Sequence, residues 1–268
     1  MQERRESSES TSSEGRAQLS PGGCADRDEG QLAIRVSAQL ISPAMRACQP
    51  MAWLLPDGEP ECGPWRIVAF DLFVACVLAA TSAPVRRPRV LAIDGRSSSG
   101  KTTLAARLQA AVSGATTVHT DYIAWWQSRF DWAELLTERI LVPLRGGGSV
   151  SYRPPAWVER GRQGAIEVSA SSDLVIVEGV GAGRREVADL VDGTVWVQAD
   201  LNSIARRNTA RIASGEADHD GVAAWMAEEF LFLADQRPWQ RAFAIAAGTT
   251  DLRYDHTDEI VLGHPPGG

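Results

Sequence analysis

The sequence predicts a three-layer α/β protein in which helices cover both faces of a mostly parallel sheet. Short, continuously apolar runs typical of buried strands, such as 88–93 and 172–180, alternate with segments rich in helix-forming residues. A glycine-rich loop, "GRSSSGKT", joins the first of these strands to the helix that follows it. Ligands bind beyond the carboxyl ends of the strands in such folds, so we examine the residues that end each strand, which are Asp94, Gly95, Asp121, Glu178 and Asp200.

The chain divides into an N-terminal extension, residues 1–64, and an α/β domain, residues 65–268. Pro, Gly, Ser and charged residues dominate the extension, and its beginning, "MQERRESSESTSSEGR", has no apolar run of signal-peptide type. Such a composition buries too little apolar surface to offset the entropy of ordering. We therefore expect the extension to be disordered or weakly structured.

Residues 67–80 are apolar except for Asp71. We expect a helix that packs one side on the following domain. A membrane anchor is the alternative, with Arg86 and Arg87 on the cytoplasmic side. Two features argue against the anchor: the run is shorter than the roughly 20 residues of a spanning helix, and Asp71 would cost about 2.5–3.5 kcal/mol on insertion.

The remaining elements alternate as the fold class requires. Asp131 is expected to cap a helix that ends at three glycines, and Pro238 is expected to end the last long helix. The predicted order is strand 88–93, helix 100–112, strand 115–121, helix 131–145, extended pieces in 149–157 and 164–170, strands 172–180 and 193–200, helices 201–213 and 222–237, and a final strand in 242–248.

The loop after the first strand of the domain fits the G-x-x-x-x-G-K-[ST] pattern, called Walker A, at every fixed position. Its glycines let successive backbone N–H groups point at an anion, and the next helix adds its positive end. Lys101 is expected to meet the β- and γ-phosphates of ATP, and the Thr102 hydroxyl to ligate Mg²⁺. The residues expected to hold the nucleotide are Gly95, Arg96, Ser97, Ser98, Ser99, Gly100, Lys101, Thr102 and Thr103.

Two acidic residues end neighbouring strands. Asp121, beside a bound γ-phosphate, could orient an attacking hydroxyl and accept its proton late in the transfer. Glu178 could be a second carboxylate that organises Mg²⁺, or it could position the acceptor. A helix cap or a solvated acid is the alternative for each, and the sequence does not divide the two roles between them.

Arginines gather on the predicted helix 201–213. Arg207 and Arg211 are four residues apart, so they lie on one face with Arg206 beside them. Arg207 could hold the nucleotide, and Arg211 could stabilise charge in the transfer as part of a lid at 201–220. A solvated basic face is the alternative. Arg184 could also reach the site from the segment after Glu178.

Aromatic residues crowd the segments after Asp121 and around "YRPP". With Arg153 they could clamp a planar ring, or they could pack as core or lid. They are Trp125, Trp126, Trp132, Tyr152 and Trp157. His119 and His219 have no partner at metal-ligand spacing, and we assign them no role.

Residues 65–250 resemble the uridine kinase-like family of P-loop small-molecule kinases, especially its short actinobacterial-type members. The resemblance rests on "IDGRSSSGKTTLA", "HTDY", "YRPP" followed by "GAIEV", "VIVEGVGAGR" and "WMAEEFLFLADQRP", in this order. It implies a P-loop NTPase fold with a parallel core of about five strands, and transfer of the ATP γ-phosphoryl group to a hydroxyl. It also implies that Lys101 and Thr102 hold phosphate and Mg²⁺, that Asp121 faces the acceptor, and that Arg211 belongs to the lid.

The predicted function is that of a cytoplasmic, Mg-ATP-dependent kinase acting on a small molecule such as a nucleoside. A nucleoside monophosphate kinase is one alternative, with its basic acceptor site supplied by Arg153, Arg160 and Arg162. An ATP-binding regulatory module without phosphotransfer is the other. The net charge of −7 argues against a nucleic-acid partner, we expect no membrane partner, and nothing in the sequence indicates the oligomeric state.

Overall fold

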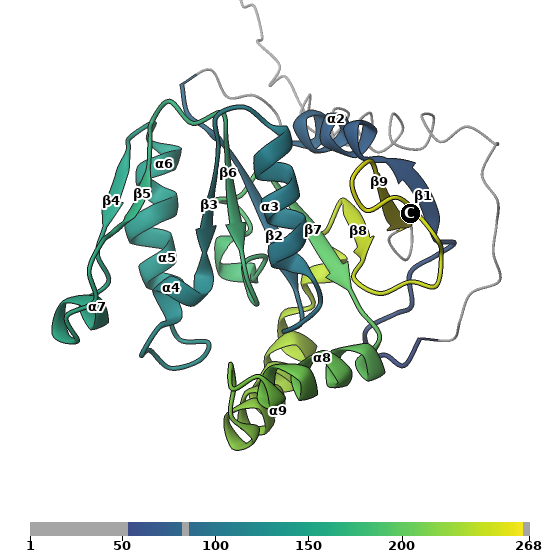
Figure 1. Ribbon diagram of the computed structural model, residues 1–268. Helices are drawn as coiled ribbons and strands as arrows, with labels where there is room; N and C mark the ends of the chain where they lie inside the picture. The colour runs from purple at the N-terminus through teal and green to yellow at the C-terminus, as the bar shows by residue number, and fades with distance from the viewer. Residues whose placement is uncertain (1–52, 82–85, 265–268) are drawn as a thin grey trace, which may run out of the picture.

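The computed structural model of the chain describes residues 53–81 and 86–264, and a seven-stranded sheet lies at its centre (Figure 1). Five neighbouring strands run parallel, which confirms the α/β class and the predicted parallel core. In spatial order the strands are β1 (Arg66–Ala69), β9 (Glu259–Gly263), β8 (Ala244–Ala247), β7 (Gly193–Gln198), β2 (Arg89–Gly95), β6 (Leu174–Glu178) and β3 (Ala115–His119).

The prediction of about five strands is wrong for the sheet as a whole, which has seven. β9 pairs antiparallel with β8, and β1 pairs antiparallel with β9. β1 comes from the start of the apolar run that we expected to be entirely helical. The helix α2 (Phe70–Ala80) begins directly after it.

α2 packs one side on the domain, as expected for this run. Its buried residues Phe70, Phe73 and Val77 meet side chains of the sheet and of α3 (Lys101–Ala111) in one core cluster. Among the described residues, no helix combines the length and apolar character needed to cross a bilayer.

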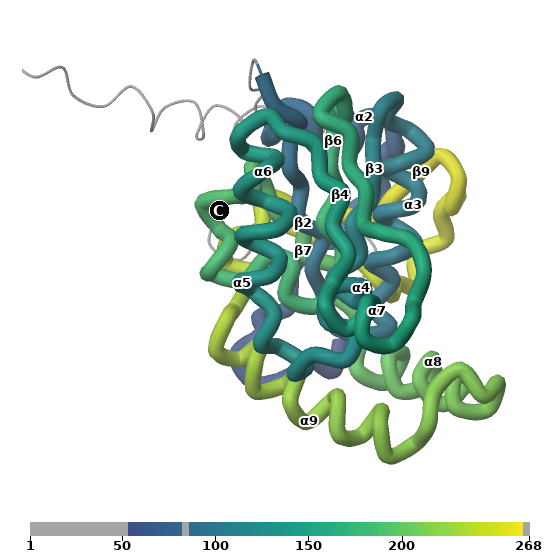
Figure 2. The backbone as a smooth tube through the Cα atoms, turned by 90° about the vertical axis from the view of Figure 1, so that its left-hand side faces the viewer, coloured from purple at the N-terminus to yellow at the C-terminus, as the bar shows by residue number. Residues whose placement is uncertain are grey.

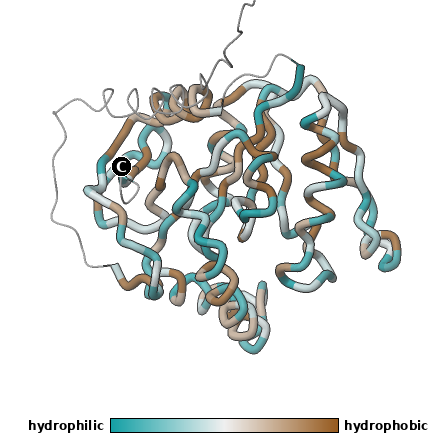
Figure 3. The backbone as a smooth tube through the Cα atoms, turned by 180° about the vertical axis from the view of Figure 1, so that it is seen from behind, coloured by the Kyte–Doolittle hydropathy of each residue, from teal (hydrophilic) through white to brown (hydrophobic). Residues whose placement is uncertain are grey.

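The central strand β2 is buried on both faces, and its side chains alternate between two cores. Leu91 and Ile93 belong to the cluster under α2 and α3. Val90 and Ala92 belong to the cluster on the opposite face. The helical stretch that covers this second face is α5 (Ala133–Leu136), η1 (Thr137–Leu141) and α6 (Val142–Arg145). Helices therefore cover both faces of the sheet, and Figure 3 shows hydrophobic residues along the central strands and the covering helices.

The start of the 133–145 helical stretch differs from the prediction by one residue. Trp132 is its N-cap, and no side chain caps it, so Asp131 does not have the predicted role. The end at Gly146 agrees with the predicted glycine stop.

A second sheet of two strands stands beside α5 and α6. β4 (Val150–Tyr152) pairs antiparallel with β5 (Ile166–Val168), and α7 (Pro155–Glu159) lies between them in the chain. Val150, Trp157 and Ile166 anchor this unit in the second-face core. Figure 2 shows α7 next to α4 (Thr120–Ala124).

Two helices gather below the carboxyl ends of the strands, as Figure 1 shows. They are α8 (Leu201–Ala213) and α9 (His219–Gln236), and short helical turns occur at η2 (Arg185–Val187) and η3 (Pro238–Gln240). Asp200 caps α8 by accepting the Ser203 N–H, and α9 ends directly before Arg237 and Pro238. The segment 201–220, for which a lid is predicted, therefore contains α8, the loop after it and the start of α9.

Candidate functional site

The glycine-rich loop joins β2 to α3 with its two glycines in places that only glycine suits. Gly100, the N-cap of α3, has φ = +106°, in the left-handed region that a residue with a Cβ rarely adopts. A Cβ on Gly95 would lie 2.6 Å from the carbonyl oxygen of Val197 in the adjacent strand β7. The loop therefore has the tight turn and the close backbone approach that the sequence pattern predicts.

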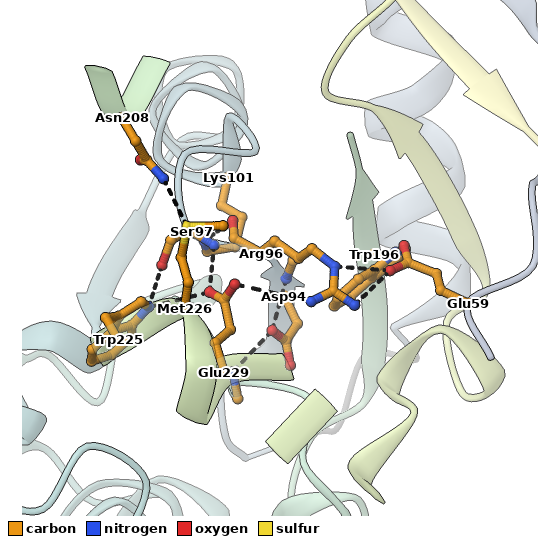
Figure 4. Close-up of polar contacts among 12 residues, drawn as sticks. Glu59, Asp94, Arg96, Ser97, Lys101, Trp196, Asn208, Trp225, Met226 and Glu229 are labelled. Carbon is orange, nitrogen blue, oxygen red and sulfur yellow. Dashed lines mark hydrogen bonds and ion pairs between the residues drawn. The ribbon is translucent and has the colours of Figure 1, made fainter. Parts of the chain in front are cut away.

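Two carboxylates hold this loop from outside (Figure 4). Glu59 accepts hydrogen bonds from the Arg96 guanidinium, at 3.0 Å from Nε, and forms an ion pair with Nη2 at 2.9 Å. Only 3% of the Arg96 side chain and 1% of the Glu59 side chain are exposed. From α9, Glu229 accepts the Ser97 N–H at 2.7 Å, and Trp225 Nε1 donates to Ser97 Oγ at 2.6 Å.

Glu59 belongs to a segment that we call the N-terminal strap, residues 53–65. The strap forms neither helix nor strand, but backbone groups tie it to the domain. The Leu54 N–H donates to Asp200, and the Leu54 carbonyl accepts the Leu201 N–H. The Cys62 N–H donates to Gln198. The strap is thus docked on the ends of β7 and α8, while residues 1–52 lie outside the described residues and the boundary at 64 stays a prediction.

Sequence reasoning missed Glu59. It stands in a Pro- and Gly-rich stretch without periodicity, 37 residues before its partner Arg96. One signal is available: a buried arginine in the glycine-rich loop requires a carboxylate partner elsewhere in the chain, because a buried charge without a partner is costly. Arg96 therefore points to Glu59 in the strap and not into the cavity, and only its backbone remains in the loop.

Lys101 lies across the loop. Its side chain is buried, and Nζ donates to the Arg96 carbonyl at 2.9 Å. Lys101 is also the only lysine among the chain's 27 lysine and arginine residues. All the remaining residues of this group are arginines. Lysine differs from them in its compact ammonium, carried on a flexible stem that can move to a phosphate.

Thr102 and Glu178 come together at the carboxyl ends of the strands. Thr102 Oγ1 donates to Glu178 Oε1 at 3.1 Å. His119 Nδ1 lies 2.7 Å from Glu178 Oε2, because strand pairing sets His119 directly beside Glu178. A hydroxyl and a carboxylate are the oxygen donors that Mg²⁺ prefers, with phosphate and water as its other ligands. This donor pair fits the metal predicted at Thr102 and Glu178.

β3 ends at His119, so Asp121, predicted to end this strand, lies instead in the first turn of α4. Burial and neighbouring charges shift the pKa values of Asp121, His119 and Glu178. Burial raises the pKa of Asp121, and Lys101 partly opposes this effect. The hydrogen bond with Glu178 raises the pKa of His119. Burial acts to raise the pKa of Glu178, but the His119 bond and the Lys101 charge outweigh it, so this pKa is lowered. The pKa values of the two carboxylates thus shift in opposite directions, upward for Asp121 and downward for Glu178.

One cavity of about 930 Å³ contains most of the predicted site residues. The glycine-rich loop lines it, and so do α8 and α9, which contact that loop. The predicted residues that line it are Ser97, Ser98, Gly100, Lys101, Thr102, Thr103, Asp121, Glu178, Arg207 and Arg211. Gly95, Arg96 and Ser99 do not line it, and the Arg96 and Ser99 residues are buried in the protein.

The arginines of α8 differ in what they contact. Arg207 bridges the loop and the strand end of β8, donating to the Ser98 and Gly248 carbonyls at 2.7 Å each. Arg211 lines the cavity. Arg206 instead donates to Ser203 Oγ on its own helix. The cavity wall beyond Arg207 includes Arg107, Tyr254 and His256, which sequence reasoning did not select.

Asp94 and Arg184 contact other parts of the fold and do not line the cavity. Asp94, fully buried, accepts the N–H groups of Gly95, Gly181 and Gly183, which ties the loop after β6 to the start of the phosphate loop. Arg184 is buried with its guanidinium 3.9 Å from the Trp132 ring. Arg184 is absent from the cavity lining, so the described structure does not bring it to the site.

No protein-family model and no curated protein sequence matches the chain. The fold is similar to several solved structures. One is a possible uridine kinase from Bacillus stearothermophilus, with 22% identity over 65% of this chain and 95% of that chain, and a TM-score of 0.45.

A second similar structure is a proposed fructose transport system kinase from Silicibacter sp. TM1040, with 18% identity over 64% of this chain and 94% of that one, and a TM-score of 0.48. Shikimate kinase from Bacteroides thetaiotaomicron has 22% identity over 56% and 79%, and a TM-score of 0.27. Likeness at this level carries no argument about activity, which must be argued from the site.

Proposed function

We propose that the protein is a Mg-ATP-dependent kinase that transfers the γ-phosphoryl group of ATP to a hydroxyl of a small molecule. The observation that carries this proposal is the single cavity that Lys101 and Thr102 share with Asp121 and Glu178. A phosphate-binding loop alone is common to many nucleotide-binding proteins. A carboxylate that lines the same cavity, Asp121, supplies what a hydroxyl acceptor needs.

The loop would hold the triphosphate with backbone N–H groups and the positive end of α3. The Ser97 N–H already has Glu229 as its acceptor and the Ser99 N–H has the Arg96 carbonyl, so the amides of Ser98, Gly100, Lys101 and Thr102 are the candidates for phosphate contacts. Lys101 Nζ would exchange its bond to the Arg96 carbonyl for a phosphate oxygen. The new bond joins two opposite charges, whereas the bond it replaces joins the ammonium to an uncharged carbonyl.

Thr102 and Glu178 would hold Mg²⁺, which neutralises charge on the β- and γ-oxygens when it is bound. Asp121 would orient the acceptor hydroxyl. As the acceptor oxygen forms its bond to the γ-phosphorus, the bond from that phosphorus to the ADP oxygen breaks, and the hydroxyl proton passes to Asp121. The raised pKa of Asp121 favours this acceptance. Positioning and electrostatics supply most of the rate in such transfers.

The acceptor class that the sequence resemblance suggests is a nucleoside. The test is ADP release from Mg-ATP in the presence of nucleosides, nucleotides, sugars and polyols, with wild-type protein, Lys101→Ala and the control Arg185→Gln. Arg185 forms an exposed ion pair with Asp235 away from the cavity. We expect turnover with one acceptor class, at least about 10³-fold slower in Lys101→Ala and unchanged in Arg185→Gln.

Two results would contradict the proposal. The first is full activity in Lys101→Ala protein. The second is tight ATP binding with no transfer to any acceptor, which would favour the regulatory-module alternative.

A further inference from the structure

Aromatic and arginine side chains surround the part of the chain that follows Asp121. The Arg162 guanidinium carbon lies 3.8 Å from the centre of the Trp157 ring, 4.8 Å from that of Tyr122 and 5.2 Å from that of Trp125. Trp125 itself lines the cavity. We call this group the acceptor rim: Tyr122, Trp125, Trp126, Trp157, Arg160 and Arg162.

Two separate segments build the acceptor rim. Tyr122 and the two neighbouring tryptophans belong to α4 and its end, whereas Trp157 and both arginines come from α7 and the loop before β5. Trp157 Nε1 donates to the Tyr122 carbonyl at 3.0 Å and joins the segments. Figure 2 shows α4 and α7 side by side. Tyr122 directly follows Asp121 and Trp125 lines the cavity, so the rim begins at the cavity and extends beyond it, with Arg160 and Arg162 outside the lining.

In the part of the chain that the structure describes, the rim arginines have no acidic partner. Within residues 53–81 and 86–264, neither Arg160 nor Arg162 forms an ion pair or a side-chain hydrogen bond, although acidic residues outnumber basic ones, 34 to 27, in the whole chain. Stacking on a ring covers the faces of a guanidinium and leaves the N–H groups at its edges free. Those edges match the two oxygens of a carboxylate or phosphate.

Trp126 supports a binding role for the rim. It is 62% exposed, and its φ of +62° lies in the left-handed region, which disfavours a residue with a bulky side chain. The Arg160 guanidinium stacks on it at 3.3 Å from the ring centre. An exposed tryptophan in a strained conformation gains little for folding, and such positions concentrate at ligand-binding sites.

We propose that the phosphate acceptor carries an oxyanion, a phosphate or a carboxylate, in addition to its reactive hydroxyl, and that Arg162 and Arg160 bind that oxyanion. This inference rests on the proposed kinase function. The anion serves only for binding and takes no part in the reaction. The new bond joins the hydroxyl oxygen to the γ-phosphorus, and the product carries the acceptor's own anion unchanged. Arg153 Nη2 donates to the Arg162 carbonyl at 2.7 Å and holds the backbone of the site.

The test compares acceptors in pairs whose members differ by the anion: uridine with UMP, fructose with fructose 6-phosphate, and glycerol with glycerate. The pairs with UMP and fructose 6-phosphate test for recognition of a phosphate, and the pair with glycerate tests for recognition of a carboxylate. We expect kcat/KM to be at least about tenfold higher for the anionic member of one pair, as the loss of one charged hydrogen bond would predict. The ³¹P spectrum of the product should show a new phosphate monoester.

Arg162→Gln is the matched variant, and Arg185→Gln is the control. We expect Arg162→Gln to raise the KM for the anionic acceptor about tenfold or more while the KM for ATP and the melting temperature stay unchanged. Arg162→Lys should restore part of the loss, because it returns the charge without the planar fork. Equal use of neutral and anionic members, or an unchanged acceptor KM in Arg162→Gln, would overturn the inference.

The outcomes also separate this inference from the proposed function. Transfer to neutral acceptors alone would retain the kinase and remove the oxyanion site. A phosphoanhydride product from UMP would put the anion at the reacting end, as in a nucleoside monophosphate kinase, and would overturn the inference. If nothing is phosphorylated but UMP quenches tryptophan fluorescence in wild type and not in Arg162→Gln, the oxyanion site stands and the kinase fails.

Discussion

The glycine-rich loop and the acceptor rim, which meets the same cavity at Trp125, are built in opposite ways. Buried charge holds the loop: Glu59 and Glu229 bind Arg96 and the Ser97 N–H from outside. Stacking holds the rim, where the guanidinium of Arg162 lies on aromatic rings without a carboxylate partner among the described residues. The difference separates two tasks, because a fixed loop suits one invariant triphosphate, and free cationic edges suit the choice of an acceptor.

The largest effect should come from the residue between the two regions. Asp121→Asn keeps the size of the side chain and removes its ability to accept a proton. We expect kcat to fall about 10²–10⁴-fold, the range of general-base contributions, with the KM for ATP within about twofold of wild type because the loop is untouched. Initial-rate kinetics measure both constants. A large rise in the KM for ATP instead would place Asp121 in nucleotide binding.

Breaking the buried Glu59–Arg96 ion pair should destabilise the protein at the glycine-rich loop. Glu59→Gln leaves the Arg96 charge buried without its main partner, and we expect a loss of about 3–5 kcal/mol in the free energy of unfolding. The double variant Glu59→Gln/Arg96→Gln removes both charges and should recover much of that loss. Urea denaturation measures each variant. If the single variant is as stable as wild type, the strap does not hold the loop.

A pH-dependent effect of moderate size should come from the His119–Glu178 pair. The pKa of His119 is raised from 6.5, so its stabilisation is complete below that value and is lost as pH rises through the raised pKa. The pKa of Glu178 is lowered from 4.5, so its stabilisation is present above that value and is lost as pH falls through the lowered pKa. Both contributions are complete between about pH 4.5 and 6.5.

His119→Gln should therefore destabilise the metal-free protein more at pH 5.5 than at pH 8.5, by about 1 kcal/mol at most, because part of the ring is exposed to solvent. Urea denaturation at both pH values with a chelator present gives the comparison. An equal loss at both pH values would show that the pair is not an ion pair.

The smallest effect on stability should come from the rim. Trp126→Gly relieves the left-handed backbone but loses the stacking of Arg160, and we expect the free energy of unfolding to stay within about 0.5 kcal/mol of wild type. Thermal denaturation measures it. A loss comparable to that of Glu59→Gln would mean that the rim, like the loop, is held for stability.

The two regions also differ in how far the sequence predicts them. The loop is continuous, and its framing by a strand and a helix is visible in sequence, so the sequence predicts Lys101 and Thr102 directly. Glu178 follows from its place at the end of β6, and Asp121 from its place just after β3. Glu59 could not be found, since it is 37 residues from Arg96 in a segment without a pattern.

The edges of the fold were harder to predict than its centre. β1 is four residues long and pairs with β9 near the other end of the described chain, so local propensity gave no signal for it. The roles of the rim aromatics remained open for the same reason. Only long-range packing brings Trp157 against Tyr122, and Arg162 against both.

The most direct test of the central claim uses the only lysine. The chain offers two amines, the N-terminus and Lys101, so pyridoxal phosphate followed by borohydride can modify one side chain, and mass spectrometry of its peptide quantifies the reaction. If the loop grips a triphosphate, Mg-ATP at saturating concentration should reduce modification of Lys101 at least about tenfold, and AMP should protect far less. Equal modification of Lys101 with and without Mg-ATP would contradict the account.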